Sequence, residues 1–309
     1  MDKQKKVSGS NKLVFVVDED HVDLELKEIL YDQMGLSSRL VRRSKRSKNI
    51  LVNGHKIPFH AKMRKGDRIE VIMEDEPNQF EPEDIPLDIA YEDMDLLIIN
   101  KQPGLVVHPT KGHPTGTLAN AIVYYMEKTN QQFKIRFINR LDRDTSGLVM
   151  VAKNPYTQQE LSKQMIDNQV EKIYLAVVKG QMDEEQGTVD APIGRPDPED
   201  ILRRVYEEGQ PSVTHYQVVE RLEDATVIKV KLETGRTHQI RVHMSHIGYP
   251  LFGDELYGYV NKDLIERQAL HAESLTFHQP RTGEEIRVKA KTPEDIQQLI
   301  EKLKSKNWA

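Results

Sequence analysis

The chain has 309 residues and a net charge of −5; 38% of its residues are apolar, 30% are charged and none is cysteine. At roughly 100–200 residues per domain, this length predicts two domains, or one large domain with an appendage, and enough apolar side chains for a core. The missing cysteine excludes disulfides, thiolate nucleophiles, iron–sulfur clusters and zinc sites with cysteine ligands.

The sequence gives no sign of membrane attachment or secretion. Its longest apolar runs, such as Leu13–Val17 and Leu96–Ile99, have the length of strands and fall far below the roughly 18 residues of a membrane span. The first six residues include lysines but no apolar stretch long enough for a secretory signal. A cytoplasmic protein without a membrane partner is expected.

Charge is unevenly distributed along the chain. Residues 1–70 hold 16 Lys and Arg against 10 Asp and Glu, residues 71–100 hold none against 10, and residues 101–309 hold 28 against 29. Contacts with phosphate depend on local positive potential. A polyanion, if one binds, is therefore expected to meet the N-terminal segment first.

The N-terminal segment predicts a small unit of helices and strands. Residues 1–12, rich in Lys, Ser and Asn, are expected to form a flexible tail. Apolar side chains recur with helical spacing over Val22–Met34, where Gly35 suits a left-handed cap, and a second helix is predicted at Ser37–Arg46. The pair Asn53-Gly54 predicts a hairpin between residues 50–52 and 55–59, and a strand follows at Arg68–Met73.

The second helix carries a stripe of arginines. Four recur at positions i, i+3, i+4 and i+7 and share one helix face: Arg39, Arg42, Arg43 and Arg46. Charge stripes are commonly solvated faces, but residues 39–68 hold eleven Lys or Arg and one acid, Asp67. Because few counter-charges are available, phosphate is the expected complement of this face.

These motifs resemble the S4-type RNA-binding module over about residues 22–74. The resemblance rests on the basic second helix opened by Leu36-Ser37-Ser38-Arg39, then on Val52-Asn53-Gly54 and Lys65-Gly66-Asp67-Arg68-Ile69. The chain departs from the module at Asp23-Leu24-Glu25-Leu26, where a basic-leucine-aspartate opening is common. The resemblance implies RNA binding by the arginine stripe, with less expected of the first helix.

An acidic, proline-containing stretch marks the expected domain boundary. The predicted organisation is a flexible tail at 1–12, a small S4-like α/β domain at 13–74, an acidic linker at 75–86 and a large domain at 87–309. In the large domain, strands outnumber helices and do not alternate regularly with them. An α+β fold with a largely antiparallel mixed sheet is therefore expected, and not a doubly wound one.

Short apolar runs and amphipathic stretches give the elements of the large domain. Strands are predicted at 96–99, 135–138, 148–152, 173–178, 213–220, 226–232 and 275–277. Helices are predicted at 118–128, 155–166 and 293–304.

The densest cluster of chemically active residues is Arg140-Leu141-Asp142-Arg143-Asp144-Thr145-Ser146-Gly147, between two predicted strands. A carboxylate flanked by arginines at the edge of a sheet has a reason to stay ionised and can be reached by a ligand. An ordinary turn, with its Asp and Thr bonded to their own backbone and its arginines in water, explains the same pattern.

Two further segments add to this cluster. Tyr174 interrupts an aliphatic strand, although most strand tyrosines simply pack. Residues 235–243, Gly-Arg-Thr-His-Gln-Ile-Arg-Val-His, follow a predicted strand with a density of donors that suits an anion. His238, His243 and His246 suggest a metal site, but they lack zincin spacing and a suitably placed carboxylate, so no metal is expected.

Three motifs, taken in chain order, resemble the signature of the RluA-type pseudouridine synthases. They are Asp142 in Arg-Leu-Asp-Arg-Asp-Thr-Ser-Gly, Tyr174 in Lys-Ile-Tyr-Leu-Ala and Arg241 in Gly-Arg-Thr-His-Gln-Ile-Arg-Val-His. Supporting matches over about residues 87–290 include residues 100–109, 116–118, 248–258 and 270–272. The chain departs from the family at two positions: Asn139, where the family usually has histidine, and Tyr249, where it often has histidine. At Asn139 we expect altered packing or substrate contact without loss of activity.

The resemblance implies a catalytic domain of pseudouridine synthase type at 87–309 that converts uridine in structured RNA to pseudouridine. Asp142 would be the catalytic carboxylate, Arg241 would keep it ionised, and Tyr174 would stack on the uracil. Arg140 would fill the gap left by a flipped base. Whether Asp142 attacks the sugar, attacks the ring, or removes a sugar proton in a glycal route stays open.

Ribosomal RNA is the preferred substrate and transfer RNA the alternative, because many ribosomal members of the family have an S4-like head. The loop 194–211 is a candidate substrate contact. No cofactor or metal is implied, and the sequence indicates no oligomeric state. Two other functions fit less well: a non-catalytic S4-type RNA-binding adaptor, and an N-glycoside hydrolase using Asp142 and Asp144 as a carboxylate pair.

Overall fold

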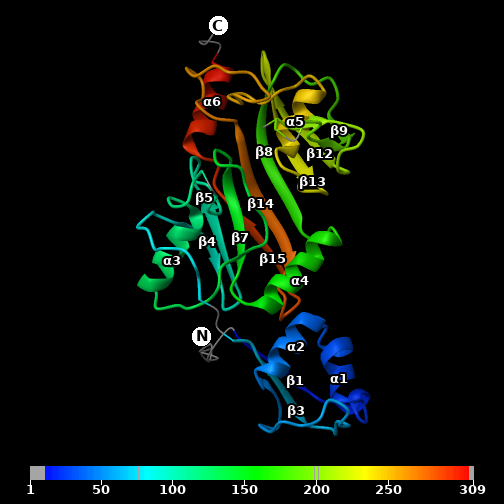
Figure 1. Cartoon of the computed structure of the whole chain (residues 1–309). Helices are drawn as coiled ribbons and strands as arrows, with labels where there is room; N and C mark the ends of the chain where they lie inside the picture. The colour runs from blue at the N-terminus through cyan, green and yellow to red at the C-terminus, as the bar shows by residue number, and fades with distance from the viewer. Residues whose placement is uncertain (1–10, 75–76, 111, 198, 201, 306–309) are drawn as a thin grey trace, which may run out of the picture.

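The computed structural model describes residues 11–74, 77–110, 112–197, 199–200 and 202–305. A small N-terminal unit lies at one end of an elongated body that contains the rest of the chain (Figure 1). Residues 1–10 of the expected tail lie outside the described residues, and strand β1 already begins at Lys12. Within the described residues, no helix is long and apolar enough to cross a membrane.

The N-terminal unit packs short helices on a three-stranded antiparallel sheet in the order β1-β3-β2. Its elements are β1 (Lys12–Val16), the 3-10 turn η1 (Glu19–His21), α1 (Leu26–Glu28), the π-type turn η2 (Ile29–Gln33), α2 (Ser38–Arg46), β2 (Ile50–Val52) and β3 (Arg68–Ile72). Ser37 caps α2, because its hydroxyl accepts the backbone N–H of Leu40 at 3.3 Å. Buried Ile29, Leu30 and Val41 close the core against Ile69.

Two predictions for this unit are wrong in part. The first helix begins at Leu26 instead of Val22, because the backbone N–H groups of Asp23 and Leu26 bond to carbonyls of residues 63 and 61. The hairpin at Asn53-Gly54 closes only one pair, Val52 with His55, and residues 57–59 form no strand. Strand β2 pairs with β3 instead, so each residue of β2 has a partner in an adjacent antiparallel strand.

The body contains a ten-stranded sheet whose main path runs β4-β5-β7-β14-β8-β13-β12-β9, with β6 paired to β7 and β15 to β14. Every pair is antiparallel except β7 with β14. The α+β class with a largely antiparallel mixed sheet is thus confirmed. The strands are β4 (Asp88–Glu92), β5 (Leu96–Lys101), β6 (Arg136–Phe137), β7 (Ser146–Ala152), β8 (Glu171–Lys179), β9 (Gln186–Asp190), β12 (Val213–Arg221), β13 (Ala225–Leu232), β14 (Leu270–His278) and β15 (Glu285–Lys289).

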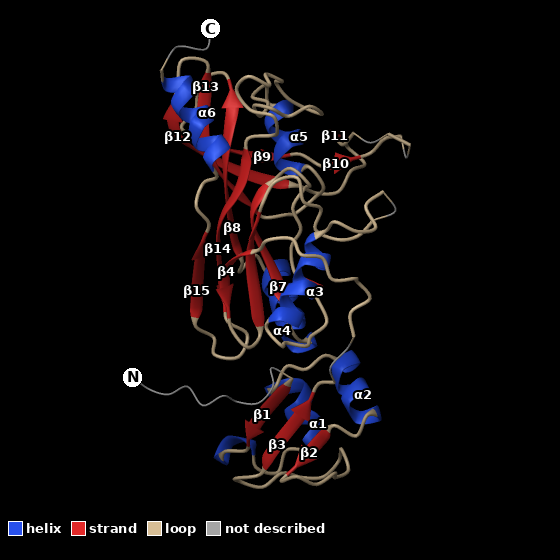
Figure 2. Cartoon of the chain, turned by 90° about the vertical axis from the view of Figure 1, so that its left-hand side faces the viewer, coloured by secondary structure: helices blue, strands red, loops and turns tan. Residues whose placement is uncertain are grey.

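Helices cover both faces of this sheet (Figure 2). They are α3 (Leu118–Lys128), α4 (Pro155–Ile166), α5 (Gln239–His246) and α6 (Glu294–Lys304), and a separate two-stranded ribbon joins β10 (Ile193–Gly194) to β11 (Arg204–Val205). Side chains of α3 and α5 share one core cluster, whereas α4 and α6 pack in clusters formed by alternate residues of the same strands. Such alternation is the expected consequence of the strand period of two.

The sequence predicted α3, α4 and α6 and most central strands, but missed β4, β9, β10, β11, β15 and α5. Residues 235–243 were expected only to be a donor-rich segment after a strand, and α5 was not predicted because polar residues open it. The stretch predicted as an acidic linker, 75–86, contacts the body through its described residues. Asn78 donates to the carbonyl of Phe133 at 2.6 Å, and Glu83 accepts the N–H of Gly116 at 2.9 Å.

The two halves of the sheet meet at a short parallel contact, where Ser146 and Gly147 of β7 face His271 and Ala272 of β14. Gly147 has φ +111°, and a Cβ atom there would lie 2.3 Å from the carbonyl oxygen of Ala272. No side chain fits in that space. This contact fixes the point at which the loop 140–145 enters β7.

We expect Gly147→Ala to destabilise the fold by about 2–5 kcal/mol, because backbone strain and overpacking add at this position. Thermal unfolding followed by circular dichroism measures the effect. Gly112→Ala is the matched control, since a Cβ at residue 112 meets no atom within 4 Å. A Gly147→Ala protein as stable as the control would contradict the close contact.

Candidate active site

Asp142 lies in the loop that enters β7, and this loop is held from three sides. Buried Lys101 donates from Nζ to the carbonyls of Gln102 and Arg143 at 2.8 and 2.9 Å. Arg267 Nη1 donates to the carbonyl of Asp144 at 3.0 Å, and Gln268 Nε2 donates to Thr145 Oγ1 at 3.1 Å. The loop is therefore ordered by partners that are remote in sequence.

The guanidinium of Arg241 joins two carboxylates. Its Nη1 donates to Asp142 Oδ2 at 3.0 Å, while Nε and Nη2 donate to Asp254 at 2.7 and 2.8 Å. Although burial alone would lower the pKa of Arg241, its hydrogen bonds and charge interactions with Asp254 and Asp142 raise that pKa above its ordinary value. The guanidinium stays charged and holds the Asp142 side chain through this hydrogen bond.

Asp254 was not assigned a role by the sequence, although the segment containing it was recognised. Its side chain is fully buried and also accepts the backbone N–H groups of Leu256 and Tyr257 at 3.0 and 3.1 Å. Four donors thus hold one carboxylate, which fixes the guanidinium of Arg241 in place. Asp254 therefore sets the position of Arg241, the partner of Asp142.

Tyr174 of β8 lies beside the same two groups. It lines a small cavity with Asp142 and Arg241, and its side chain is buried. Burial, followed by the charge of Asp142, raises the pKa of the Tyr174 hydroxyl above its ordinary value, so the phenol is protonated at neutral pH. The three predicted catalytic residues are brought together from β8, α5 and the loop before β7.

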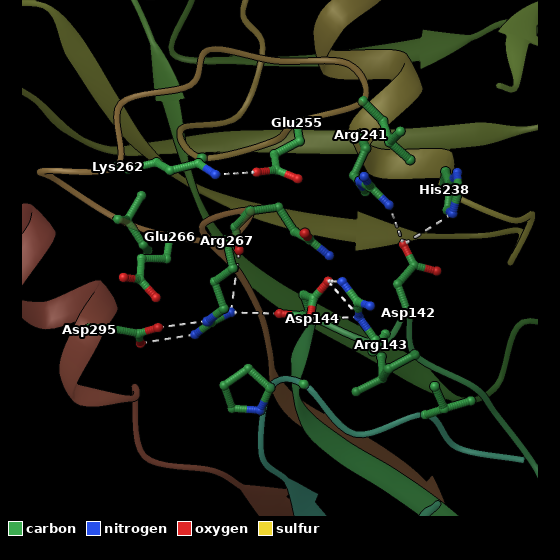
Figure 3. A pocket seen from close by; sticks show the side chains of 18 of the residues that line it. Asp142, Arg143, Asp144, His238, Arg241, Glu255, Lys262, Glu266, Arg267 and Asp295 are labelled. Carbon is green, nitrogen blue, oxygen red and sulfur yellow. Dashed lines mark hydrogen bonds and ion pairs between the residues drawn. The ribbon is translucent and has the colours of Figure 1, made fainter. Parts of the chain in front are cut away.

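A larger open cavity of about 1060 Å³ adjoins this cluster and is lined by Asp142, His238 and Arg241 (Figure 3). Several of its cations are neutralised by acids: Arg143 pairs with Asp144, Lys262 with Glu255, and Arg267 with Asp295. Arg140 lies exposed at the boundary of both cavities. Among the described residues it makes no ion pair, so its charge is available at the cavity mouth.

The histidines of the donor-rich segment point to different surroundings. His238 faces Asp142, whereas buried His243 contacts Thr214 Oγ1 at 2.8 Å and the carbonyl of Ala191 at 2.9 Å. His246 is exposed at the end of α5. They do not converge, and no group of three potential metal ligands occurs within the described ranges.

The four predicted RNA-binding arginines of α2 line one cavity of about 710 Å³, together with Ser47 and Glu74. Arg39, Arg42 and Arg46 are exposed, and Arg43 is half-buried. They therefore share a face, as the helical spacing predicted. This face lies on the N-terminal unit and contributes nothing to the cavities around Asp142.

The structure explains the two departures noted in the sequence. Asn139 donates to the carbonyl of Leu148 at 3.1 Å and accepts the N–H of Met150 at 2.8 Å, so its amide serves β7 as a backbone partner. Tyr249 lies over Gly180 and donates to Asp183 at 3.4 Å. Neither side chain lines the cavities that contain Asp142.

Comparison with known proteins identifies this combination of fold and motifs. A family described as RNA pseudouridylate synthase matches residues 95–246. An RNA pseudouridine synthase of Bacillus subtilis (strain 168) is 43% identical over 82% of this chain and 86% of its own length. The ribosomal large subunit pseudouridine synthase D of Escherichia coli (strain K12) is 40% identical over 83% of each chain.

A solved structure agrees with these relatives. The human RNA Pseudouridylate Synthase Domain Containing 1 superposes with a TM-score of 0.57 at 30% identity, and the match covers 67% of this chain and 84% of that one. The likeness therefore extends from the sequence to the arrangement of the sheet.

The buried Lys101 predicts a pH dependence of stability. Burial lowers its pKa in the folded protein from 10.5 to about 7. Between these values the unfolded chain binds a proton that the folded chain does not, so the free energy of unfolding rises with pH. At 1.36 kcal/mol per pH unit, this group adds about 2–3 kcal/mol between about pH 7 and about pH 9.5.

Urea unfolding at the two pH values measures this contribution. Lys101→Met should lack the rise, whereas Lys163→Met, at an exposed position of α4, should keep it. Parallel pH profiles of wild type and Lys101→Met would show that Lys101 is not the group responsible.

Proposed function

The chain belongs to the RNA pseudouridylate synthase family, and from that premise we propose that Asp142 is the residue on which its chemistry depends. The enzyme isomerises uridine in RNA to pseudouridine: the base is detached at its nitrogen, turned, and rejoined to the ribose through carbon 5. The observation that carries the proposal is the Asp142–Arg241 ion pair of 3.0 Å at the wall of an open cavity.

Asp142 acts as an ionised carboxylate beside the target nucleotide. Carboxylates are effective covalent catalysts at sugar centres, and a negative charge stabilises an oxocarbenium-like state. The same group serves as a base if the reaction passes through a glycal. All three routes require the deprotonated form, and the guanidinium of Arg241 holds that carboxylate in place.

Tyr174 and Arg140 bind the nucleotide in this proposal. Tyr174 offers its ring to the uracil, and its protonated hydroxyl keeps the ring neutral. A uridine within RNA structure reaches Asp142 only after it leaves its stack, which costs on the order of a few kcal/mol. Arg140, exposed at the cavity mouth, fills the vacated space.

We propose ribosomal RNA as the substrate, with transfer RNA as the alternative that the test below distinguishes. The Escherichia coli relative is named for the large ribosomal subunit, and the N-terminal unit at 13–74 is proposed to be an S4-like RNA-binding domain. The common face that the four arginines of α2 share supports this role. The N-terminal unit and the body are joined where Gln159 accepts the N–H of Ser37 at 2.8 Å and donates to the carbonyl of Gly35 at 2.7 Å.

A groove at this junction supports binding of one RNA across both parts. A cavity of about 590 Å³ is lined by Arg39 and Arg43 from α2 and by Lys134 and Arg136 from the body. Positive side chains from both parts therefore face the same space. We propose that RNA held on α2 continues along this groove toward the catalytic domain at 87–309.

The role of Asp142 is tested with purified protein and two substrates, a large-subunit ribosomal RNA transcript and a transfer RNA transcript. Asp142→Asn should lower the rate of pseudouridine formation by at least about a thousandfold, because an amide carries no negative charge and is a poor nucleophile and base. Asp167→Asn, at an exposed position after α4, should match wild type.

Each outcome has a defined meaning. Conversion by Asp142→Asn at the wild-type rate would refute the catalytic role of Asp142. Release of free uracil would indicate an N-glycoside hydrolase, and tight binding without conversion would indicate an RNA-binding adaptor. Modification of the transfer RNA alone would overturn the ribosomal assignment.

The arginine face predicts a change in the salt dependence of RNA binding. Replacing Arg39, Arg42 and Arg46 together by Gln should weaken binding and lower the slope of log K against log salt by about 2–3, if each contacts one phosphate. Filter binding over a salt series measures the slope. A triple Gln variant at the exposed positions Lys229, Lys231 and Lys289 removes the same charge and should leave it unchanged. Equal slopes for the two variants would exclude the α2 face from the RNA interface.

A further inference from the structure

His238 lies between Asp142 and the half-buried Tyr257, and no role has so far been given to it. It directly precedes α5 with a left-handed backbone, φ 59° and ψ 18°, which is uncommon for residues other than glycine. Its side chain is 17% exposed and lines both cavities that contain Asp142. A non-glycine residue held in this conformation at an active site suggests that the position of its side chain matters.

The hydroxyl of Tyr257 determines which ring nitrogen of His238 carries the proton. This oxygen accepts the backbone N–H of Arg203 at 2.8 Å and lies 2.8 Å from His238 Nδ1. Burial raises the pKa of Tyr257, so its hydroxyl keeps the hydrogen. Within the described residues, Nδ1 is the acceptor in reach of that hydrogen. This arrangement favours the tautomer in which Nδ1 accepts and Nε2 carries the N–H.

The Nε2–H group faces the reacting carboxylate without bonding to it. His238 Nε2 lies 3.9 Å from Asp142 Oδ2, beyond hydrogen-bond distance, whereas Arg241 bonds the same oxygen at 3.0 Å (Figure 3). The donor thus points into the open cavity at the place where a nucleotide meets Asp142. An oxygen atom of that nucleotide would complete its hydrogen bonding.

The imidazole is neutral at neutral pH. Burial, the largest influence, lowers the pKa of His238, and the charges that face it are those of Asp142, Arg241, Asp254 and Arg203. A neutral ring donates from Nε2 without weakening the ion pair of Asp142 with Arg241. It is suited to stabilise charge on a substrate and not to deliver a proton.

We propose that His238 donates its Nε2–H to a carbonyl oxygen of the target uracil, and that Tyr257 positions it. This proposal rests on the proposed function. When the bond from ribose C1′ to uracil N1 breaks, its electron pair moves onto the uracil, where the negative charge is shared between N1 and the two carbonyl oxygens. A fixed donor at such an oxygen stabilises the charge as it develops, and no proton is transferred.

The first experiment separates donation from packing. His238→Phe keeps a ring beside Tyr257 but removes the donor, whereas His238→Gln keeps an N–H at a comparable reach. Single-turnover conversion at saturating RNA should fall about 10–100-fold in the Phe variant and less than about tenfold in the Gln variant. RNA affinity should be unchanged in both. Equal loss in both variants, or loss of affinity alone, would contradict a donor role.

The second experiment identifies the acceptor with RNA that carries 2-thiouridine or 4-thiouridine at the target position. Sulfur accepts hydrogen bonds more weakly than oxygen, so one of the two replacements should slow wild type, and the same replacement should have little effect on His238→Phe. If both proteins respond equally to both replacements, His238 contacts neither carbonyl. Wild-type protein that converts no uridine, or Asp142→Asn that converts it normally, would instead refute the proposed function.

The third experiment tests the part played by Tyr257. Nitrogen-15 NMR of the labelled protein should show His238 protonated at Nε2 in wild type, and Tyr257→Phe should shift the population toward the Nδ1-protonated form and slow conversion. His243, whose ring contacts Thr214 and Ala191, is the internal reference that should not change. A wild-type His238 protonated at Nδ1 would overturn the proposed role of Tyr257.

Discussion

The arrangement of the active site depends on one buried guanidinium bound to two carboxylates of different exposure. Asp254 is fully enclosed and uses both oxygens to hold Arg241, whereas Asp142 is partly exposed and shares only one oxygen with it. A buried ion is costly unless every donor is satisfied, and Asp254 meets most of that requirement. Arg241 can then orient Asp142 without depending on it, and among the described residues the second carboxylate oxygen of Asp142 has no side-chain partner, as the proposed function requires.

The fold brings these residues together at the centre of the sheet. The parallel contact between β7 and β14 places the loop of Asp142 next to Arg267 and Gln268, which precede β14 in the chain. Lys101 reaches the same loop from the end of β5. The loop is therefore bonded to β5 and to the segment that precedes β14, and these bonds order its backbone. Preorganised groups of this kind give electrostatic catalysis its effect.

Regular sequence patterns predicted the parts of the molecule that follow local rules. Helical spacing located α3, α4 and the arginine face of α2, and continuous apolar runs located β5, β7, β8 and β13. The missed strands β4, β9 and β15 are less apolar and lie at or near sheet edges, where exposed side chains hide the pattern. The predicted first helix was too long at its N-terminus. Residues 22–25 are not helical, because their backbone bonds to the distant segment 61–63.

The sequence by itself determined the chemistry available to this protein: an aspartate between arginines, a tyrosine within an aliphatic strand and an arginine among histidines. These could be recognised because residue types and short spacings are written in the chain. Tertiary structure alone decided which groups meet. Asp142, Arg241 and Asp254 belong to separate segments. The Tyr257 hydroxyl, which contacts His238 and accepts the backbone N–H of Arg203, joins three more positions that no local spacing relates. Such contacts arise from the order of strands in the sheet, which depends on the packing of the whole chain.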